Sequence, residues 1–138
     1  MAQGIINAVI ETASNKLVLG CKATKIPQSI TSIEEYAFYF SGLENIDIPS
    51  SVKNIGRCAF EHCNMESVKL PYGLTCIENG VFERCFNLKE INIPSSVKRI
   101  GDLAFYDCTE LSQICIPDSV SAIGDYAFSS TGIVSSIK

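Results

Sequence analysis

The chain has 138 residues, of which 46% are apolar and 19% are charged, a composition that supports one continuous core and predicts a single domain over residues 1–138. Its net charge is −4, with 11 basic and 15 acidic side chains interspersed, which argues against nucleic acid or an anionic membrane surface as the main partner. The opening MAQGIINAVIETA has no basic start and too short an apolar run for a signal peptide or a membrane span, so membrane insertion is not expected.

Residues 1–20 do not follow the pattern of the rest of the chain. The segment IINAVIETASNKLVLG has two apolar-rich stretches around Ser14 and Asn15, which favour a turn, so we expect a β-hairpin. We expect this hairpin to cover the first of the units that follow, where the apolar end of the core would otherwise be exposed.

Residues 21–138 are organised as about five repeats, the last of them incomplete. Prolines recur in steps of 22, 22, 23 and 23 residues, and a phenylalanine follows each proline after 11 residues. A fixed period in the twenties is typical of a solenoid, whose units stack because none can bury its own apolar face. The prolines are Pro27, Pro49, Pro71, Pro94 and Pro117, and the phenylalanines are Phe38, Phe60, Phe82, Phe105 and Phe128.

Each repeat is expected to contain two extended stretches and a turn. Before the proline, alternating residues such as Ile46 and Ile48 indicate a strand with one buried face. Equivalent strands of successive repeats must run parallel, so the sequence predicts one parallel sheet on one face of the solenoid. The proline ends this strand, a second short strand follows, and the next segment, with its Ala-Phe pair, is expected to form a one-turn 3₁₀ helix.

The seven cysteines suggest a disulfide framework at first, but their number is odd and three of them occupy one position in successive repeats. Cys63, Cys85 and Cys108 each lie three residues after the repeat phenylalanine. A free cysteine packs as a small apolar side chain, so buried thiols are favoured over disulfides. Neighbouring members of this column would still lie within reach of a disulfide, and the spacing alone does not exclude one.

Residues that alternate with the buried strand positions form two outward columns in which no residue type repeats. A scaffold that displays a binding surface would show this pattern, and freely varying solvated positions would show it equally. Asp47 beside Lys69 is explained as easily by a weak cross-strand charge pair. The candidate binding residues are Asn45, Ser67, Glu90 and Gln113 in one column and Asp47, Lys69, Asn92 and Cys115 in the other.

No catalytic, cofactor or metal site is expected. Cys58, His62 and Cys63 are close in sequence, but a zinc site needs four convergent ligands and no second pair of ligands has the required spacing. A cysteine–histidine nucleophile would also need an orienting group and a concave site, which the outer corner of a coil does not offer.

The repeats IPSSVKNIGRCAFEHC and IPSSVKRIGDLAFYDC resemble those of the BspA-like leucine-rich-repeat family, and the resemblance covers about residues 17–138. It implies an α/β-type right-handed superhelix that is predominantly β, with a parallel sheet on one face and short strands and 3₁₀ turns on the other. It carries no catalytic residue. It also implies that the chain is part of a longer secreted or surface protein of bacteria or mucosal protists, with an adhesive role.

Two functions follow from these expectations. The first is a non-catalytic module that binds a protein or glycan ligand through the sheet face, and the second is a stiff spacer of a larger surface protein. A cytoplasmic location stays open as an alternative. The last coil, which includes Ile123, Phe128, Val134 and Ile137, has no successor in the sequence, so its apolar end is expected to favour self-association.

Overall fold

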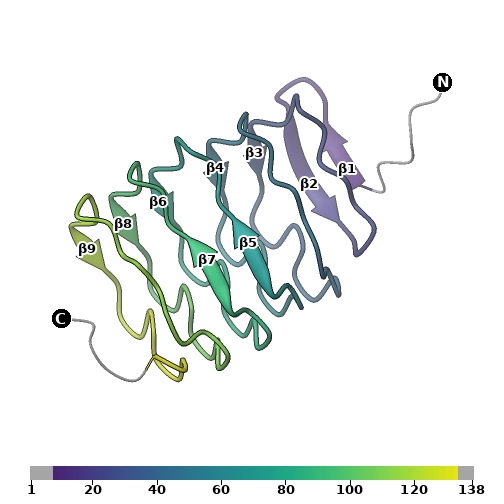
Figure 1. Ribbon diagram of the computed structural model, residues 1–138. Helices are drawn as coiled ribbons and strands as arrows, with labels where there is room; N and C mark the ends of the chain where they lie inside the picture. Colours follow the sequence, from purple (N-terminus) through teal and green to yellow (C-terminus); the bar gives the residue numbers. More distant parts are fainter. Residues whose placement is uncertain (1–7, 134–138) are drawn as a thin grey trace.

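The computed structural model describes residues 8–133, which form a stack of coils that runs from an N-terminal hairpin to the C-terminal end (Figure 1). The hairpin consists of β1 (Ala8–Glu11) and β2 (Lys16–Gly20), which pair antiparallel. β2 also pairs in parallel with β3 (Ser32–Ile33), the first strand of the repeats. The hairpin therefore extends the hydrogen-bonded wall of the first coil, as its apolar strands require.

The short strands that follow the prolines form one wall of the stack and succeed one another along its upper side in Figure 1. They are β3, β4 (Asn54–Ile55), β6 (Cys76–Ile77), β8 (Arg99–Ile100) and β9 (Ala122–Ile123). Their pairing is parallel, and it divides into two sheets with the orders β1-β2-β3-β4 and β6-β8-β9. The wall is therefore interrupted between the second and third coils.

Glycine at the end of the short strand allows the coils to approach closely. A Cβ atom at Gly56 would lie 2.5 Å from the backbone nitrogen of Glu35, and the amide of Gly56 donates to Ile33 O at 2.8 Å. In the third coil this position is Glu78, and no strand pairing joins β6 to β4 among the described residues. A side chain at this position does not by itself prevent pairing, because Glu34 occupies it where β3 pairs with β2 and its amide donates to Leu17 O at 2.9 Å.

The strands that precede the prolines pair over a shorter stretch of the stack than the sequence predicts. β5 (Ser67–Lys69) and β7 (Glu90–Asn92) pair in parallel, with Val68 opposite Ile91. The equivalent residues 45–47 and 113–115 are not assigned as strands. The prediction of one sheet through these coils is therefore wrong in its extent.

The segment after the short strand forms overlapping turns instead of the expected 3₁₀ helix. In the first coil the amide of Ala37 donates to Glu34 O at 3.2 Å, which closes one such turn. Tyr36 and Phe40 have φ values of 60° and 54°, in the left-handed region, whereas a 3₁₀ helix requires negative φ throughout. The prediction of a 3₁₀ turn is wrong for this reason.

Hydrogen bonds between the coils stabilise these turns. The amide of Phe38 donates to Ala59 O at 2.7 Å, and the amide of Phe60 donates to Val81 O at 3.0 Å. Equivalent bonds join the later coils, where the amide of Phe82 donates to Ala104 O and the amide of Phe105 donates to Ala127 O. A left-handed residue other than glycine persists only where its surroundings impose the conformation. The ladder of bonds supplies that constraint, and we refer to this side of the stack, residues 34–41 and their equivalents, as the turn wall.

The core runs along the axis of the stack as a column of phenylalanine rings. Phe38, Phe60, Phe82 and Phe105 are fully buried, and successive rings, including Phe128, are stacked with centroids 5.2 to 5.7 Å apart. Such offset stacking is favourable beyond the burial of the rings themselves. The phenylalanines that recur at one position of the repeat in the sequence are therefore neighbours in the core.

The cysteine column lies beside the phenylalanines and is buried. Each thiol donates to the carbonyl of the phenylalanine one coil earlier: Cys63 to Phe38, Cys85 to Phe60 and Cys108 to Phe82, each at 3.1 Å. All seven cysteines are free in the structure. A thiol thus fills a small apolar position and also gives a second hydrogen bond to a carbonyl group that already accepts one from an amide of its own turn, as Phe38 O does from Ser41.

Candidate interaction surface

All eight predicted binding residues are exposed on one face of the stack, where β5 and β7 lie side by side at the front of Figure 1. The strand register places Ser67 opposite Glu90 and Lys69 opposite Asn92, as the two predicted columns require. We call this surface the sheet face, and it comprises Asn45, Asp47, Ser67, Lys69, Glu90, Asn92, Gln113 and Cys115.

The expected charge pair between Asp47 and Lys69 does not form. Neither side chain makes a hydrogen bond or an ion pair with another described residue. By contrast, the Oδ1 atom of Asn92 accepts a hydrogen bond from the amide of Leu70 at 2.9 Å. The sheet face therefore presents a carboxylate and an ammonium group whose hydrogen-bonding capacity is free, next to an amide whose orientation is fixed.

A hollow of about 560 Å³ lies on the sheet face at the corner where the strands meet the prolines. Apolar side chains, among them Leu70 and Pro94, line it together with Asp47, Lys69 and Asn92. Its lining also includes Tyr72, which is 71% exposed and which sequence reasoning missed. The signal was present, because Pro71-Tyr72-Gly73 replaces the Pro-Ser-Ser of the repeats that begin at Pro49 and Pro94.

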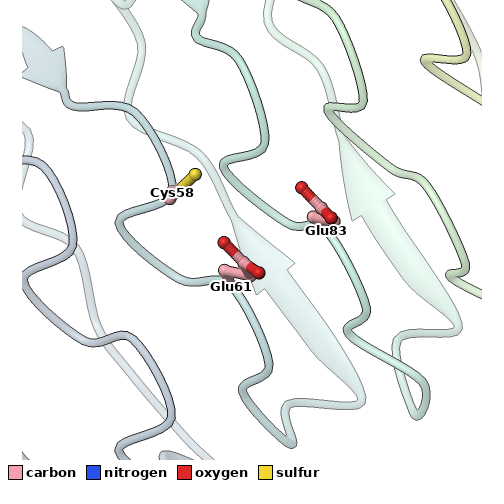
Figure 2. A group of neighbouring side chains, drawn as sticks. All are labelled: Cys58, Glu61 and Glu83. Carbon is pink, nitrogen blue, oxygen red and sulfur yellow. The ribbon is translucent and has the colours of Figure 1, made fainter.

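A second cluster of side chains lies on the turn wall and consists of Cys58, Glu61 and Glu83. Figure 2 shows Cys58 and Glu61 on one coil and Glu83 on the next. The thiol sulfur and one carboxylate oxygen of each glutamate all lie within 4.8 Å of one another. Sequence reasoning had considered Cys58 with His62 and Cys63, but the structure does not bring these three together in a cluster. Cys63 is a buried donor to Phe38 O, and the His62 ring stacks on Phe40 at 3.9 Å.

The chemistry of this cluster is that of an ion-pair network. Burial, followed by hydrogen bonding to Glu61, raises the pKa of Cys58 to about 11, so its thiol is protonated at neutral pH. Burial and then the nearby Glu61 carboxylate raise the pKa of Glu83. The guanidinium of Arg84 lies 3.1 Å from Glu83 and 3.8 Å from Glu61, and so supplies a cation to both carboxylates. Three groups with a protonated thiol fall short of the four ligands of a structural zinc site.

An aromatic strip on the turn wall is a further exposed feature. Tyr39 contacts both Tyr36 and Phe40 edge-on, at centroid distances of 5.6 and 4.9 Å. His62 connects Phe40 to Phe86, whose ring lies 5.4 Å from the imidazole. These side chains pack on one another across three coils and therefore stabilise the surface as well as exposing it.

The coils, the repeated hydrogen bonds between them and the phenylalanine column together define a leucine-rich-repeat solenoid. Six copies of the BspA type leucine rich repeat region match residues 14–137, so the chain belongs to this family. Proteins built from these repeats are generally interaction or scaffold modules and are typically not enzymes.

Solved structures of other leucine-rich repeat proteins share the fold. A leucine-rich repeat protein from Bacteroides ovatus is 27% identical with a TM-score of 0.63, and the match covers 90% of this chain and 40% of that one. A leucine rich cell surface protein from Faecalibacterium prausnitzii is 32% identical with a TM-score of 0.60, over 78% of this chain and 36% of that one. The T. pallidum leucine rich repeat protein is 28% identical with a TM-score of 0.67, and the match covers 76% of this chain and 51% of that one.

The chain spans about half or less of the length of each of these structures. Among curated proteins, none matches the sequence significantly. Within residues 8–133 there is no helix with the length and hydrophobicity to cross a membrane.

Proposed function

We propose that the chain is a non-catalytic module that binds a protein or glycan ligand through the sheet face. The observation that carries this proposal is the exposure of unpaired Asp47 and Lys69 on a face whose two central strands are hydrogen-bonded to each other. Lys69 lies in β5, which is already ordered by its pairing with β7, so binding there costs little conformational entropy. Unpaired charges of both signs favour a ligand of complementary polarity and orient it during association.

We further propose that the module is part of a longer secreted or cell-surface protein with an adhesive role. The Faecalibacterium prausnitzii structure, which this chain matches over 78% of its length, is that of a cell surface protein. The chain also corresponds to only 36 to 51% of each of the three related structures, as a segment of a longer repeat array would.

A stiff spacer is the alternative function, and it is favoured by the continuous phenylalanine column and the hydrogen bonds of the turn wall. A spacer needs rigidity but no particular outward side chains. Substitutions on the sheet face therefore distinguish the two functions, because they weaken ligand binding only in a binding module.

The test uses a double variant on the sheet face, Lys69→Glu with Asn92→Asp. An aspartate can still accept the bond from the Leu70 amide, so the strands should remain paired. The variant should lose binding to ligands that wild-type protein retains from a panel of immobilised glycans and extracellular matrix proteins. Lys98→Glu is the matched control, because Lys98 is exposed but is not a sheet-face residue, and this variant should bind normally. Loss of binding in the control alone would place the site elsewhere.

We also propose that the 138-residue chain self-associates through its last coil. Ile123 is 47% exposed and Tyr126 is 69% exposed, and β9 pairs with β8 on one side only among the described residues. Val134 and Ile137, which the sequence also assigns to this coil, lie outside the described residues. Sedimentation velocity should show less association for Ile123→Lys with Tyr126→Ser than for wild-type protein, and equal association would contradict the proposal.

A further inference from the structure

The hollow beside Tyr72 combines an apolar floor with polar groups at its rim. Leu70 and Pro94, both buried, contribute to the floor, and the exposed Asp47, Lys69 and Asn92 contribute to the rim. Its volume of about 560 Å³ falls within the range of small-molecule sites. Three other hollows of about 540 to 590 Å³ are lined by residues of the same face, and this one differs from them in having an aromatic side chain in its lining.

Tyr72 is held in place although it is exposed. Its hydroxyl lies 3.3 Å from the hydroxyl of Ser95 in the next coil. The next residue, Gly73, has a φ of +103° and its amide donates to the Ser96 hydroxyl at 3.1 Å, so the backbone that carries the tyrosine is fixed to the next coil. A large aromatic side chain left 71% exposed but positioned by its neighbours is suited to contact a ligand.

The rim supplies complementary hydrogen-bonding groups. Asp47 offers acceptors only, and Lys69 offers donors only, and neither is engaged by another described side chain. Because the Oδ1 atom of Asn92 accepts from Leu70, its Nδ2 group is left as a donor at the rim. Donors and acceptors are therefore both available within one small site, and their orientation is set in part before a ligand arrives.

We infer that this hollow binds one neutral hexopyranose unit of a glycan. A pyranose ring has a face of C–H groups that packs on an aromatic ring, and hydroxyl groups that each donate and accept hydrogen bonds. Tyr72 with the apolar floor matches the first property, and Asp47, Lys69 and Asn92 match the second. The two opposite charges give the site no net preference for an ionic sugar. The inference rests on the proposed binding role of the sheet face and names the ligand class for it.

The experiment is a titration of ¹⁵N-labelled protein with the methyl glycosides of galactose, glucose and mannose. Binding is measured from the changes in the amide chemical shifts. A ligand with so few atoms should bind with a Kd on the order of 1 to 10 mM. For at least one of the three sugars, saturable shifts should be confined to residues 69–73 and to the neighbourhoods of Asp47 and Asn92. N-acetylneuraminic acid should produce weaker shifts than the neutral sugar that binds.

Tyr72→Ala should weaken the binding of that sugar at least tenfold, while Tyr72→Phe, which keeps the ring, should retain it. Tyr39→Ala is the control, because Tyr39 is also exposed but lies on the turn wall, and the binding of the sugar by this variant should be unchanged. Asp47→Asn should also weaken binding, and the amide spectrum of each variant verifies its fold.

The inference is overturned if none of the three sugars shifts these amides at about 20 mM, well above the expected Kd. Equal binding by Tyr72→Ala, or tighter binding of the acidic sugar, would overturn it as well. If a protein ligand is lost with Lys69→Glu but no sugar binds, the sheet face keeps its proposed function and its ligand is a polypeptide. The two failures are therefore distinguishable.

Discussion

Replacing the buried Phe82 with alanine should destabilise the protein more than truncating any side chain on its surface or in its loops. The ring of Phe82 is fully buried and stacks on Phe60 and Phe105, with centroid distances of 5.7 and 5.5 Å. Truncating a buried phenylalanine typically costs about 3–5 kcal/mol, and each lost stacking contact accounts for about 0.5–1.5 kcal/mol. Because Phe82 has a stacked neighbour on both sides, we expect a loss of about 4–5 kcal/mol.

Urea denaturation of wild-type and variant protein measures this loss as a change in the free energy of unfolding. Phe86→Ala is the matched control, since Phe86 is only four residues away but is 42% exposed, and it should cost less than about 1 kcal/mol. Phe128→Ala should be intermediate, because that ring is half-buried and stacks on Phe105 alone among the described residues. Equal losses at positions 82 and 86 would refute the assignment of the core column.

Gly56→Ala should cost about 1–3 kcal/mol because the new Cβ would meet the backbone of Glu35, whereas Glu78→Ala, at the same position of the next coil, should change stability by less than about 1 kcal/mol. Burial raises the pKa of Cys108 from about 9 to about 12. The protonated thiol therefore stabilises the folded state fully below pH 9, and this contribution is lost as the pH rises toward 12 because the thiol of the unfolded chain ionises first. Between about pH 8 and 10.5 wild-type protein should therefore lose roughly 2 kcal/mol more than Cys108→Ser, and an identical pH dependence would contradict the assignment. Thiol titration without reductant should detect the two exposed cysteines readily in native protein and nearly all seven cysteines after unfolding, and recovery of a single thiol would indicate three disulfides.

The repeat period and the core columns could be predicted because the same residue type recurs at the same position of successive repeats, as at Phe60 and Phe82. Stacking equivalent coils makes equivalent positions neighbours, so a column in the sequence becomes a contact in space. The inward cysteines and the exposed sheet-face residues followed from the same reasoning. Their hydrogen bonds did not, since a sequence does not show which carbonyl a thiol such as Cys85 will meet.

The turn wall could not be predicted from local preference. Tyr36, Cys58 and Leu103 occupy the same left-handed position, yet their side chains have nothing in common. The conformation is imposed by hydrogen bonds between coils, which act against the local preference of each residue. The extent of the sheet was missed for a related reason, because alternation of apolar residues reports which face is buried and not whether two strands are hydrogen-bonded.

The two clusters of side chains were missed although both left a signal in the repeats. Glu61 and Glu83 each follow the repeat phenylalanine by one residue, so aligning the coils places them next to each other. Tyr72 stands where the neighbouring repeats have serine. Both signals lie outside the positions that are uniform in all repeats, which are the positions used to define the core.

Hydrogen–deuterium exchange of the protein, alone and with a ligand retained in the binding screen, tests the central claim most directly. If the sheet face is the binding surface, bound ligand should slow exchange in peptides that contain β5 and β7, while the turn wall from Tyr36 to Phe40 should exchange at its free rate. Protection confined to the turn wall, with β5 and β7 unchanged, would contradict the account.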